Sequence, residues 1–442
     1  MSSLEADAGR DPAPTGTVSR MAWRILPLLG VAYLFAYMDR VNIGFAALQM
    51  NADLGFSATV YGLGGGLFFL AYALFEVPSN LILTRVGARR WIARIMITWG
   101  VLAAGMMFVH AAWQFYLVRF LHGAAEAGFF TGIVYYLAHW FPKAVRGRAL
   151  SVIYTLGALA GVVIGALSPI LLSLDGAHGM QGWQWLFLVE GLPAALVGLA
   201  ILLFLPDSPA SVRWLDASEK AWLARALAED GEEHAPPDGR AVLAALRHPQ
   251  VLWLSVFGFL TVGTGITFTL SGPQMLQAAG GLDTAIVGRL TSLAGLLGAV
   301  GILIAGIASD RRGERFSVMV VSTAATGICY AIMAVTTREH ATLFVTTYLV
   351  WGFAVWAVTF GNIMCWADHL PRHLLAVGCA AINMISQLGA FLMPYAWGAA
   401  QDRSGGFAGG LSGLAAASAL AVVVALAARS QVRRRRLEPL PA

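Results

Sequence analysis

Charged residues are scarce in this chain. Asp, Glu, Lys and Arg account for 12% of its 442 residues, whereas an ordinary soluble domain carries about 25%. Hydrophobic residues account for 58%, and many form runs as long as the roughly 20 helical residues that cross a bilayer core. This composition excludes an ordinary soluble globular protein and predicts a polytopic membrane protein.

The long apolar runs also lack the alternation of polar and apolar residues that is typical of membrane β-strands. Helices and closed barrels are the structures that satisfy backbone hydrogen bonds in lipid, so we predict an all-α protein with about twelve transmembrane helices. The expected spans are residues 22–47, 58–83, 91–111, 113–138, 148–174, 184–205, 249–277, 285–308, 316–336, 341–367, 374–400 and 407–428.

Several functional motifs are missing as well. No GxxxxGK[ST] sequence is present, so ATP-driven pumping has no nucleotide site. No nucleophile–base constellation or metal-ligand spacing indicates an enzyme, a cofactor or a resident metal. The chain has three cysteines, all in apolar runs, and we expect them to pack as small apolar side chains. They are Cys329, Cys365 and Cys379.

Basic residues gather in the loops on one side of the expected membrane. That side holds Arg10, Arg20, Arg24, Arg85, Arg89, Arg90, Arg94, Lys143, Arg146, Arg148, Arg311, Arg312, Arg315, Arg372 and the run Arg433 to Arg436. The other side keeps Arg289, Arg338 and Arg403. Because basic loops stay in the cytoplasm, we predict an inner-membrane protein with both termini cytoplasmic. We expect the arginine run to contact anionic lipid rather than nucleic acid.

One long polar segment, residues 206–250, divides the chain. It contains an amphipathic stretch and an acidic, proline-bearing stretch, which is typical of a linker with a surface helix. No signal peptide is evident, since residues 1–20 lack an apolar segment. We predict a disordered cytoplasmic arm (1–21), a six-helix bundle (22–205), a cytoplasmic linker with an amphipathic helix (206–248), a second six-helix bundle (249–428) and a basic cytoplasmic tail (429–442).

The two halves repeat the same landmarks. Gly87 and Gly313, each in an arginine-rich turn, are 226 residues apart. Pro142 and Pro371, each followed by a basic residue, are 229 residues apart. Two independent landmarks at nearly one spacing favour a duplicated six-helix unit. Such repeats place a substrate site near the membrane midplane, where the halves meet.

Several motifs resemble those of the major facilitator superfamily and, more specifically, of its anion:cation symporter family. They are Asp310-Arg311-Arg312-Gly313; Arg119, Gly123 and Glu126; Ala125-Glu126-Ala127-Gly128-Phe129-Phe130; Tyr135-Tyr136; Trp140-Phe141-Pro142; Asp39-Arg40-Val41-Asn42-Ile43; and Phe75-Glu76-Val77-Pro78-Ser79-Asn80. The resemblance covers about residues 22–430. It implies two pseudo-symmetric six-helix bundles and transport of carboxylates, as in bacterial carriers of sugar acids, tartrate and phthalate and in sialin and the vesicular glutamate transporters. Thr131 stands where the family usually has proline, and Gln387 where asparagine is common.

Ionisable residues inside the expected spans are few, and their cost in a bilayer makes each a functional candidate. They are Asp39, Arg40, Glu76, Arg119, Glu126 and Glu190. Arg40 shares a helix face with Tyr33 and Tyr37, whereas Asp39 points about 100° away. We expect Arg40 to bind the substrate anion in a central cavity and Asp39 to face a neighbouring helix or the proton path. The alternative is a satisfied intramembrane ion pair.

Arg119, Gly123 and Glu126 lie on one face of the fourth expected helix. Gly123 permits another helix to approach closely. Desolvation favours the neutral form of a carboxyl group and a nearby arginine favours the ionised form, so a change in the Arg119–Glu126 distance could switch protonation. We therefore assign proton coupling to Asp39 and Glu126, with a permanent salt bridge as the alternative. Arg119 is a candidate substrate contact or a group that only tunes Glu126.

Further substrate-binding candidates come from both halves. They are Tyr37, Asn42 and Tyr72 in the first half and Asn383 and Gln387 in the second. Polar side chains of this kind are also ordinary contacts between membrane helices. For Glu76 and Glu190 we expect structural roles, as caps or partners of helix ends and loop arginines, and for His122 a packing role.

The two repeated turns are expected to act as conformational latches. Glycine permits the tight turn, and the charges can pair with helix ends in one state and release in the other. The expected gating residues are Arg85, Gly87, Arg89, Arg90, Asp310, Arg311, Gly313 and Arg315.

These features together predict proton-coupled import of a small organic anion, such as a sugar acid, a hydroxydicarboxylate or an aromatic acid. Arginine supplies the partner for the anion, and buried carboxyl groups carry the coupling protons. The expected partners are the anion, protons and membrane lipid, and the protein is expected to act as a monomer. The alternatives are an anion exchanger, which needs no titrating carboxyl, and a receptor with a transporter fold.

Overall fold

The computed structural model describes residues 14–230, 239–312, 315–336, 340–370 and 375–437. Within these residues the long elements are all helices. They are α1 (Thr17–Asp53), α2 (Ala58–Val86), α3 (Ala88–Gly105), α4 (Ala112–Glu126), α5 (Phe129–Ala138), α6 (Lys143–Ala158), α7 (Ala160–Leu172), α8 (Gly182–Phe204), α9 (Ala217–Glu229), α10 (Gly239–Ala245), α11 (Pro249–Gly280), α12 (Thr284–Arg312), α13 (Arg315–Val335), α14 (Ala341–His369), α15 (Leu375–Ser404) and α16 (Ala408–Leu437).

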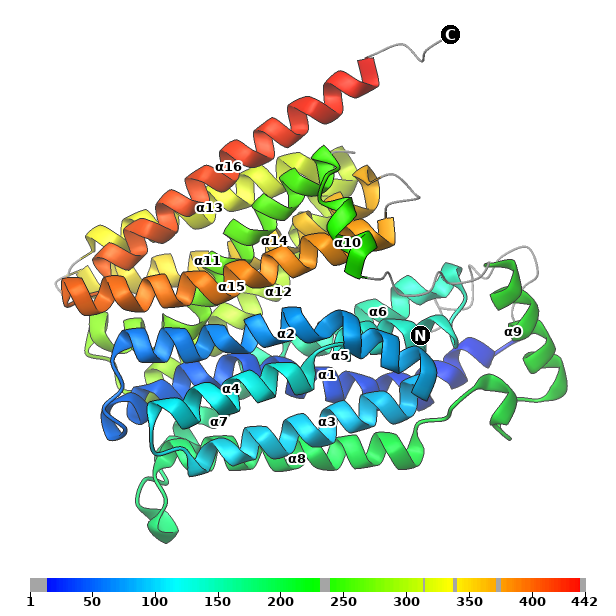
Figure 1. Cartoon of the computed structure of the whole chain (residues 1–442), viewed down its shortest axis with the longest axis horizontal. Coiled ribbons are helices and arrows are strands. Elements are labelled where there is room, and N and C mark those ends of the chain that lie inside the picture. Colours follow the sequence, from blue (N-terminus) through cyan, green and yellow to red (C-terminus); the bar gives the residue numbers. More distant parts are fainter. Residues whose placement is uncertain (1–13, 231–238, 313–314, 337–339, 371–374, 438–442) are drawn as a thin grey trace.

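The helices form two bundles that lie side by side (Figure 1). Helices α1 to α8 make one bundle and α11 to α16 the other, with α9 and α10 between them in the chain. In the described residues, 11 helical segments are long and apolar enough to cross a membrane. The remaining expected span, 113–138, is present as two consecutive shorter helices, α4 and α5. The predicted all-α fold of two six-helix bundles is confirmed.

Two predicted boundaries differ from the structure. Helix α1 begins at Thr17, so the last residues of the expected disordered arm are helical, while residues 1–13 lie outside the described residues. Helix α1 extends back to Thr17 because Thr17, Val18 and Met21 are buried against the rest of the bundle. At the other end α16 continues to Leu437, so the arginine run prolongs a helix.

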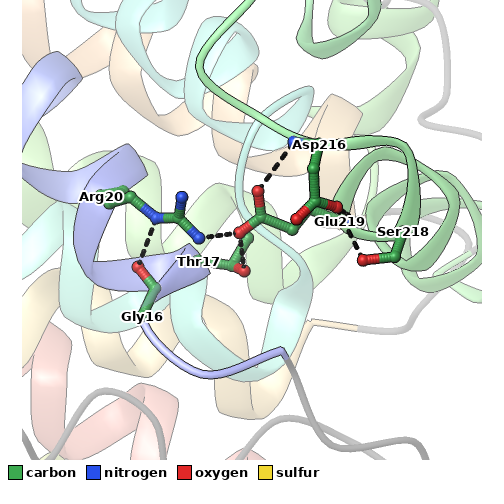
Figure 2. A network of polar contacts seen from close by, with 6 residues as sticks. All are labelled: Gly16, Thr17, Arg20, Asp216, Ser218 and Glu219. Atoms are coloured by element: carbon green, nitrogen blue, oxygen red, sulfur yellow. Dashed lines mark hydrogen bonds and ion pairs between the residues drawn. The ribbon is translucent and has the colours of Figure 1, made fainter.

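The linker helix α9 is fastened to the start of α1 through Glu219 (Figure 2). The Glu219 carboxylate is buried and accepts hydrogen bonds from the Thr17 hydroxyl and the Arg20 guanidinium. Beside it, Trp222 and Leu223 join the apolar core of the first bundle. The amphipathic stretch of the linker therefore covers one end of this bundle.

Asp216 caps the first turn of α9. Its carboxylate accepts a hydrogen bond from the backbone N–H of Glu219 at 2.8 Å and one from the Ser218 hydroxyl at 2.6 Å. These bonds hold the pKa of Asp216 below its ordinary value, and the bond from Ser218 contributes most. The cap therefore remains ionised at neutral pH.

The two bundles make close contacts at the end away from Thr17, where α1 finishes and α2 begins. A Cβ added to Gly62 would lie 2.2 Å from the Pro394 carbonyl oxygen, and one added to Gly66 would lie 2.4 Å from that of Phe391. Asp402 of α15 accepts hydrogen bonds from the first backbone N–H groups of α2, at 3.0 and 2.9 Å. Small residues and a helix cap thus join the halves here.

Candidate functional site

A break between α4 and α5 positions Glu126. Helix α4 ends at Glu126, and Gly128 follows with φ of 83°, a backbone conformation that favours glycine. The Ala127 carbonyl, which the break frees, accepts a hydrogen bond from the Ser79 hydroxyl at 2.6 Å. Gly123 lets α4 lie directly on the backbone of Phe68 in α2. The Glu126 carboxyl therefore projects from the end of a helix inside the bundle.

Arg40 pairs with Glu126 rather than remaining free. Its Nη2 donates to Glu126 Oε1 at 2.6 Å, with the Glu126 side chain fully buried and that of Arg40 22% exposed. The guanidinium also lies over the rings of Tyr37 and Tyr72, at 5.3 and 5.6 Å from the centroids. Sequence reasoning correctly grouped Arg40 with Tyr37. It considered Arg119, on the same helix, as the arginine beside Glu126, whereas in this conformation the ion-pair partner comes from another helix.

Asp39 lies in the same cluster, on the buried side. It is 4% exposed, and its Oδ2 is 3.2 Å from Nε2 of His122. Ligand atoms of Asp39, His122 and Glu126 all lie within 4.8 Å of one another. Three such groups resemble a cation site, but the Arg40 guanidinium already neutralises Glu126. The two carboxyls expected to couple protons are therefore neighbours, and His122, expected to pack, also contacts one of them.

Arg119 is enclosed by protein. It is 2% exposed, and its guanidinium lies over the Phe68 ring at 4.7 Å from the centroid. It acts electrostatically on Asp39 more than on Glu126. In this conformation Arg119 is placed to compensate buried negative charge, and contact with a substrate would require its exposure.

Asn42 extends the buried cluster toward α8. It is fully buried and donates hydrogen bonds to Glu190 and, at 3.5 Å, to Asp39. The structure therefore does not bring Asn42 to the partly exposed face of Arg40. The expected pairing of Glu190 with helix ends and loop arginines is also wrong, because its partner is this amide inside the bundle.

Glu76 connects the two halves. Asn383 Nδ2 in α15 donates to Glu76 Oε2 in α2 at 2.8 Å, and both side chains are half-buried. Sequence reasoning took Glu76 for a helix-end cap, which the structure corrects. One feature of the sequence could have placed Glu76 near the site: it lies one helical turn after Tyr72, on the same helix face. Gln387 lies one turn beyond Asn383 and is also half-buried.

An aromatic contact from the second half also reaches the site. The Trp356 ring in α14 lies 6.0 Å from the ring of Tyr37, which itself flanks Arg40. The expected site residues of the second half, Asn383 and Gln387, included no aromatic side chain. The site is thus bounded by α1, α2 and α4 on one side and by α14 and α15 on the other.

The expected gating residues are partly described. Gly87 has φ of 93° between α2 and α3, as the tight turn requires. Arg89 pairs with Asp207 at 2.7 Å, whereas Arg85, Arg90 and Arg311 are exposed. Gly313 and the side chains of Asp310 and Arg315 lie outside the described residues. The gating role stays a prediction.

Comparison with known proteins places these observations in a family. The sequence model of the family described as Major Facilitator Superfamily matches residues 29–394 of this chain. A candidate tartrate transporter of Agrobacterium vitis is 39% identical over 420 residues, covering 93% of this chain and 94% of the relative. A quinolone resistance transporter of Acinetobacter baumannii is 35% identical, covering 89% and 90%.

Solved structures match the same fold. A bacterial homologue of the human lysosomal transporter Spinster, in an inward-facing and occupied conformation, aligns with a TM-score of 0.74 at 17% sequence identity. The alignment covers 97% of this chain and all of the other. At this identity the likeness establishes the architecture, and the substrate has to be inferred from the site.

Proposed function

The chain belongs to the major facilitator superfamily of membrane transporters, and we propose that it imports a small organic anion across the inner membrane together with protons. The pairing of Arg40 with Glu126 carries this proposal. Arg40 is the partly exposed cation of the site, so an arriving carboxylate must compete with Glu126 for it. Protonation of Glu126 would release Arg40 for the anion.

The charges around Arg40 favour such coupling. The polar groups of this region include four carboxyls and two guanidiniums. They are Asp39, Glu76, Glu126 and Glu190 against Arg40 and Arg119. With every carboxyl ionised the region would be net negative, and an anion would meet repulsion on entry. Taking up protons first removes that repulsion and makes anion entry depend on the proton.

The distribution of basic residues supports the proposed orientation in the membrane. Basic residues concentrate in the loops on the side of the termini, so we propose that both termini are cytoplasmic. The halves then contact each other closely at the periplasmic end, through Gly62, Gly66 and Asp402. An organic-acid substrate is consistent with the relative named for tartrate.

An anion exchanger is the second candidate, because exchange needs Arg40 alone. Uptake into proteoliposomes separates the two. A panel of radiolabelled carboxylates is offered with and without an inward proton gradient, and with and without unlabelled carboxylate inside. Symport predicts accumulation that follows the proton gradient in empty vesicles. Uptake that requires internal carboxylate and ignores the gradient would establish exchange instead, and absence of carboxylate uptake would refute both.

A further inference from the structure

Glu76 is a carboxyl group that the proposed anion and proton sites leave unused. It follows Tyr72, which packs on Arg40, by one turn of α2. Asn383 Nδ2 reaches Glu76 Oε2 from α15 at 2.8 Å. Helices from both halves therefore meet at a half-buried carboxyl group beside the anion site.

The groups around Glu76 that are free to bind a ligand are hydrogen-bond acceptors. A carboxylate only accepts hydrogen bonds, so the Asn383 amide must turn its Nδ2 toward it and its Oδ1 away. The carbonyl oxygen of Asn383 and the remaining lone pairs of Glu76 are then available to donors. Arg40 is near enough to act on Glu76 electrostatically. The site thus joins a cationic end to an end made of acceptors.

We propose that Glu76, with Asn383, makes the protein selective for hydroxylated monocarboxylates. This inference rests on the proposed function, since it requires the substrate carboxylate on Arg40. Hydroxyl groups further along the substrate donate to Glu76 and to the Asn383 carbonyl oxygen. A second carboxylate at the far end of the substrate would meet Glu76, and like charges brought together at a binding surface exclude a ligand.

Matched acids test this selectivity. Gluconate and glucarate differ at one end, where a hydroxymethyl group replaces a carboxylate, and threonate and tartrate form the same pair at four carbons. Competition of each acid against a transported panel carboxylate is measured for the wild type and Glu76→Gln. The glutamine keeps the shape and can still accept from Asn383, but it removes the charge.

The wild type should favour the hydroxymethyl member of at least one pair by about tenfold. In Glu76→Gln the preference should fall to about twofold or reverse, mainly because the dicarboxylate binds better. A wild-type preference for the dicarboxylates, or a ratio unchanged in Glu76→Gln, overturns the inference. So does competition by none of the four acids while another panel carboxylate is transported.

Separate variants distinguish failure of the inference from failure of the proposed function. Arg40→Ala should lose binding of every acid, whereas retained binding there would refute the proposed anion site itself. Glu229→Gln removes an exposed charge on α9 and should leave the ratio unchanged. If Glu76→Gln does not fold, Asn383→Ala serves instead. It should weaken the hydroxymethyl acids without improving the dicarboxylates, and equal weakening of both would count against the inference.

Discussion

The two halves of this transporter share a fold but differ in their buried polar groups. In the described residues, the buried charged side chains and the buried histidine all belong to the first half and the linker. They are Asp39, Arg119, His122, Glu126, Glu190 and Glu219. The buried polar residues of the second half are serines, threonines and one asparagine. A duplicated architecture therefore carries an unequal distribution of chemistry.

The buried hydroxyls of the second half are largely satisfied by their own helices. Thr267 donates to the Gly263 carbonyl at 2.7 Å, and Ser322 donates to that of Val318 at 2.6 Å. Such bonds make a hydroxyl inexpensive in lipid and leave it with little to offer a ligand. The second half instead contributes Trp356 and Asn383 at the interface. The comparison suggests that one half holds the charge and the other shapes and encloses the site.

The largest effect is expected for Arg40, the partly exposed cation of the site in the first half. Arg40→Ala leaves Glu126 buried without its partner and removes the anion contact, so affinity should fall at least about 100-fold. Arg40→Lys should recover part of it, because a point charge cannot reproduce a planar fork. Calorimetric titration of the purified protein with its transported carboxylate measures both. Unchanged affinity in the alanine variant would transfer the anion site to Arg119.

The next effect concerns the coupling carboxyls. Glu126→Gln and Asp39→Asn mimic protonated groups, so both variants should bind substrate and exchange it in counterflow. They should not accumulate it along a proton gradient, because no proton remains to be released. Paired counterflow and gradient-driven uptake provide the measurement. Wild-type proton dependence in both variants would make these residues members of a structural ion-pair network.

A smaller effect tests whether the second half also controls closure of the site. Asp402 caps α2 of the other half, whereas Asp283 caps α12 within its own half, accepting from Ile286 at 2.7 Å. Losing a cap costs about 1 kcal/mol, so Asp402→Ala should shift the open-to-closed ratio at this end about fivefold. Asp283→Ala should not shift it. Spin labels at the exposed positions 52 and 408 report the distance, and equal shifts in both variants would deny Asp402 this role.

The smallest effect is expected at the linker, which holds charge outside the transport site. Glu219→Gln weakens the bonds to Thr17 and Arg20, and the melting temperature should fall by a few degrees, since a buried hydrogen bond to a charged group contributes about 1.5–3 kcal/mol. Coupling should be unchanged. Glu229→Gln, exposed on the same helix, is the control. If Glu219→Gln lost proton-driven uptake and Glu229→Gln kept it, Glu219 in the linker would also be needed for proton coupling.

The Asp216 cap gives this linker a defined pH dependence. Because its pKa lies below the ordinary value of aspartate, the stabilisation it provides is present at neutral pH and is lost as the pH falls through the lowered pKa. Melting curves of the wild type and Asp216→Asn should therefore converge only in acid. Convergence already near neutral pH would contradict the capping geometry.

Sequence reasoning named the charged side chains that cluster in the first half, but not most of the pairs that they form. Arg40 with Tyr37, and the candidates Asp39 and Glu126, were found because ionisable groups are conspicuous in apolar helices. The Arg40–Glu126 pair and the Asn42–Glu190 pair were missed, since each joins side chains from different helices. Helical periodicity orders the residues of one helix and does not specify which helix lies opposite.

Composition and spacing along the chain were enough to predict that the protein crosses a membrane as helices, that it is built from two related halves, and that the candidate charged groups of the transport site lie in the first half. These properties follow from local composition and spacing, because lipid requires long apolar helices whatever their arrangement. The tertiary structure decided which carboxyl meets which arginine, that the fourth span breaks after Glu126, and that Glu76 and Asn383 meet across the halves. Those contacts depend on helix packing and on the rotation of each helix about its axis, which neighbouring helices set together.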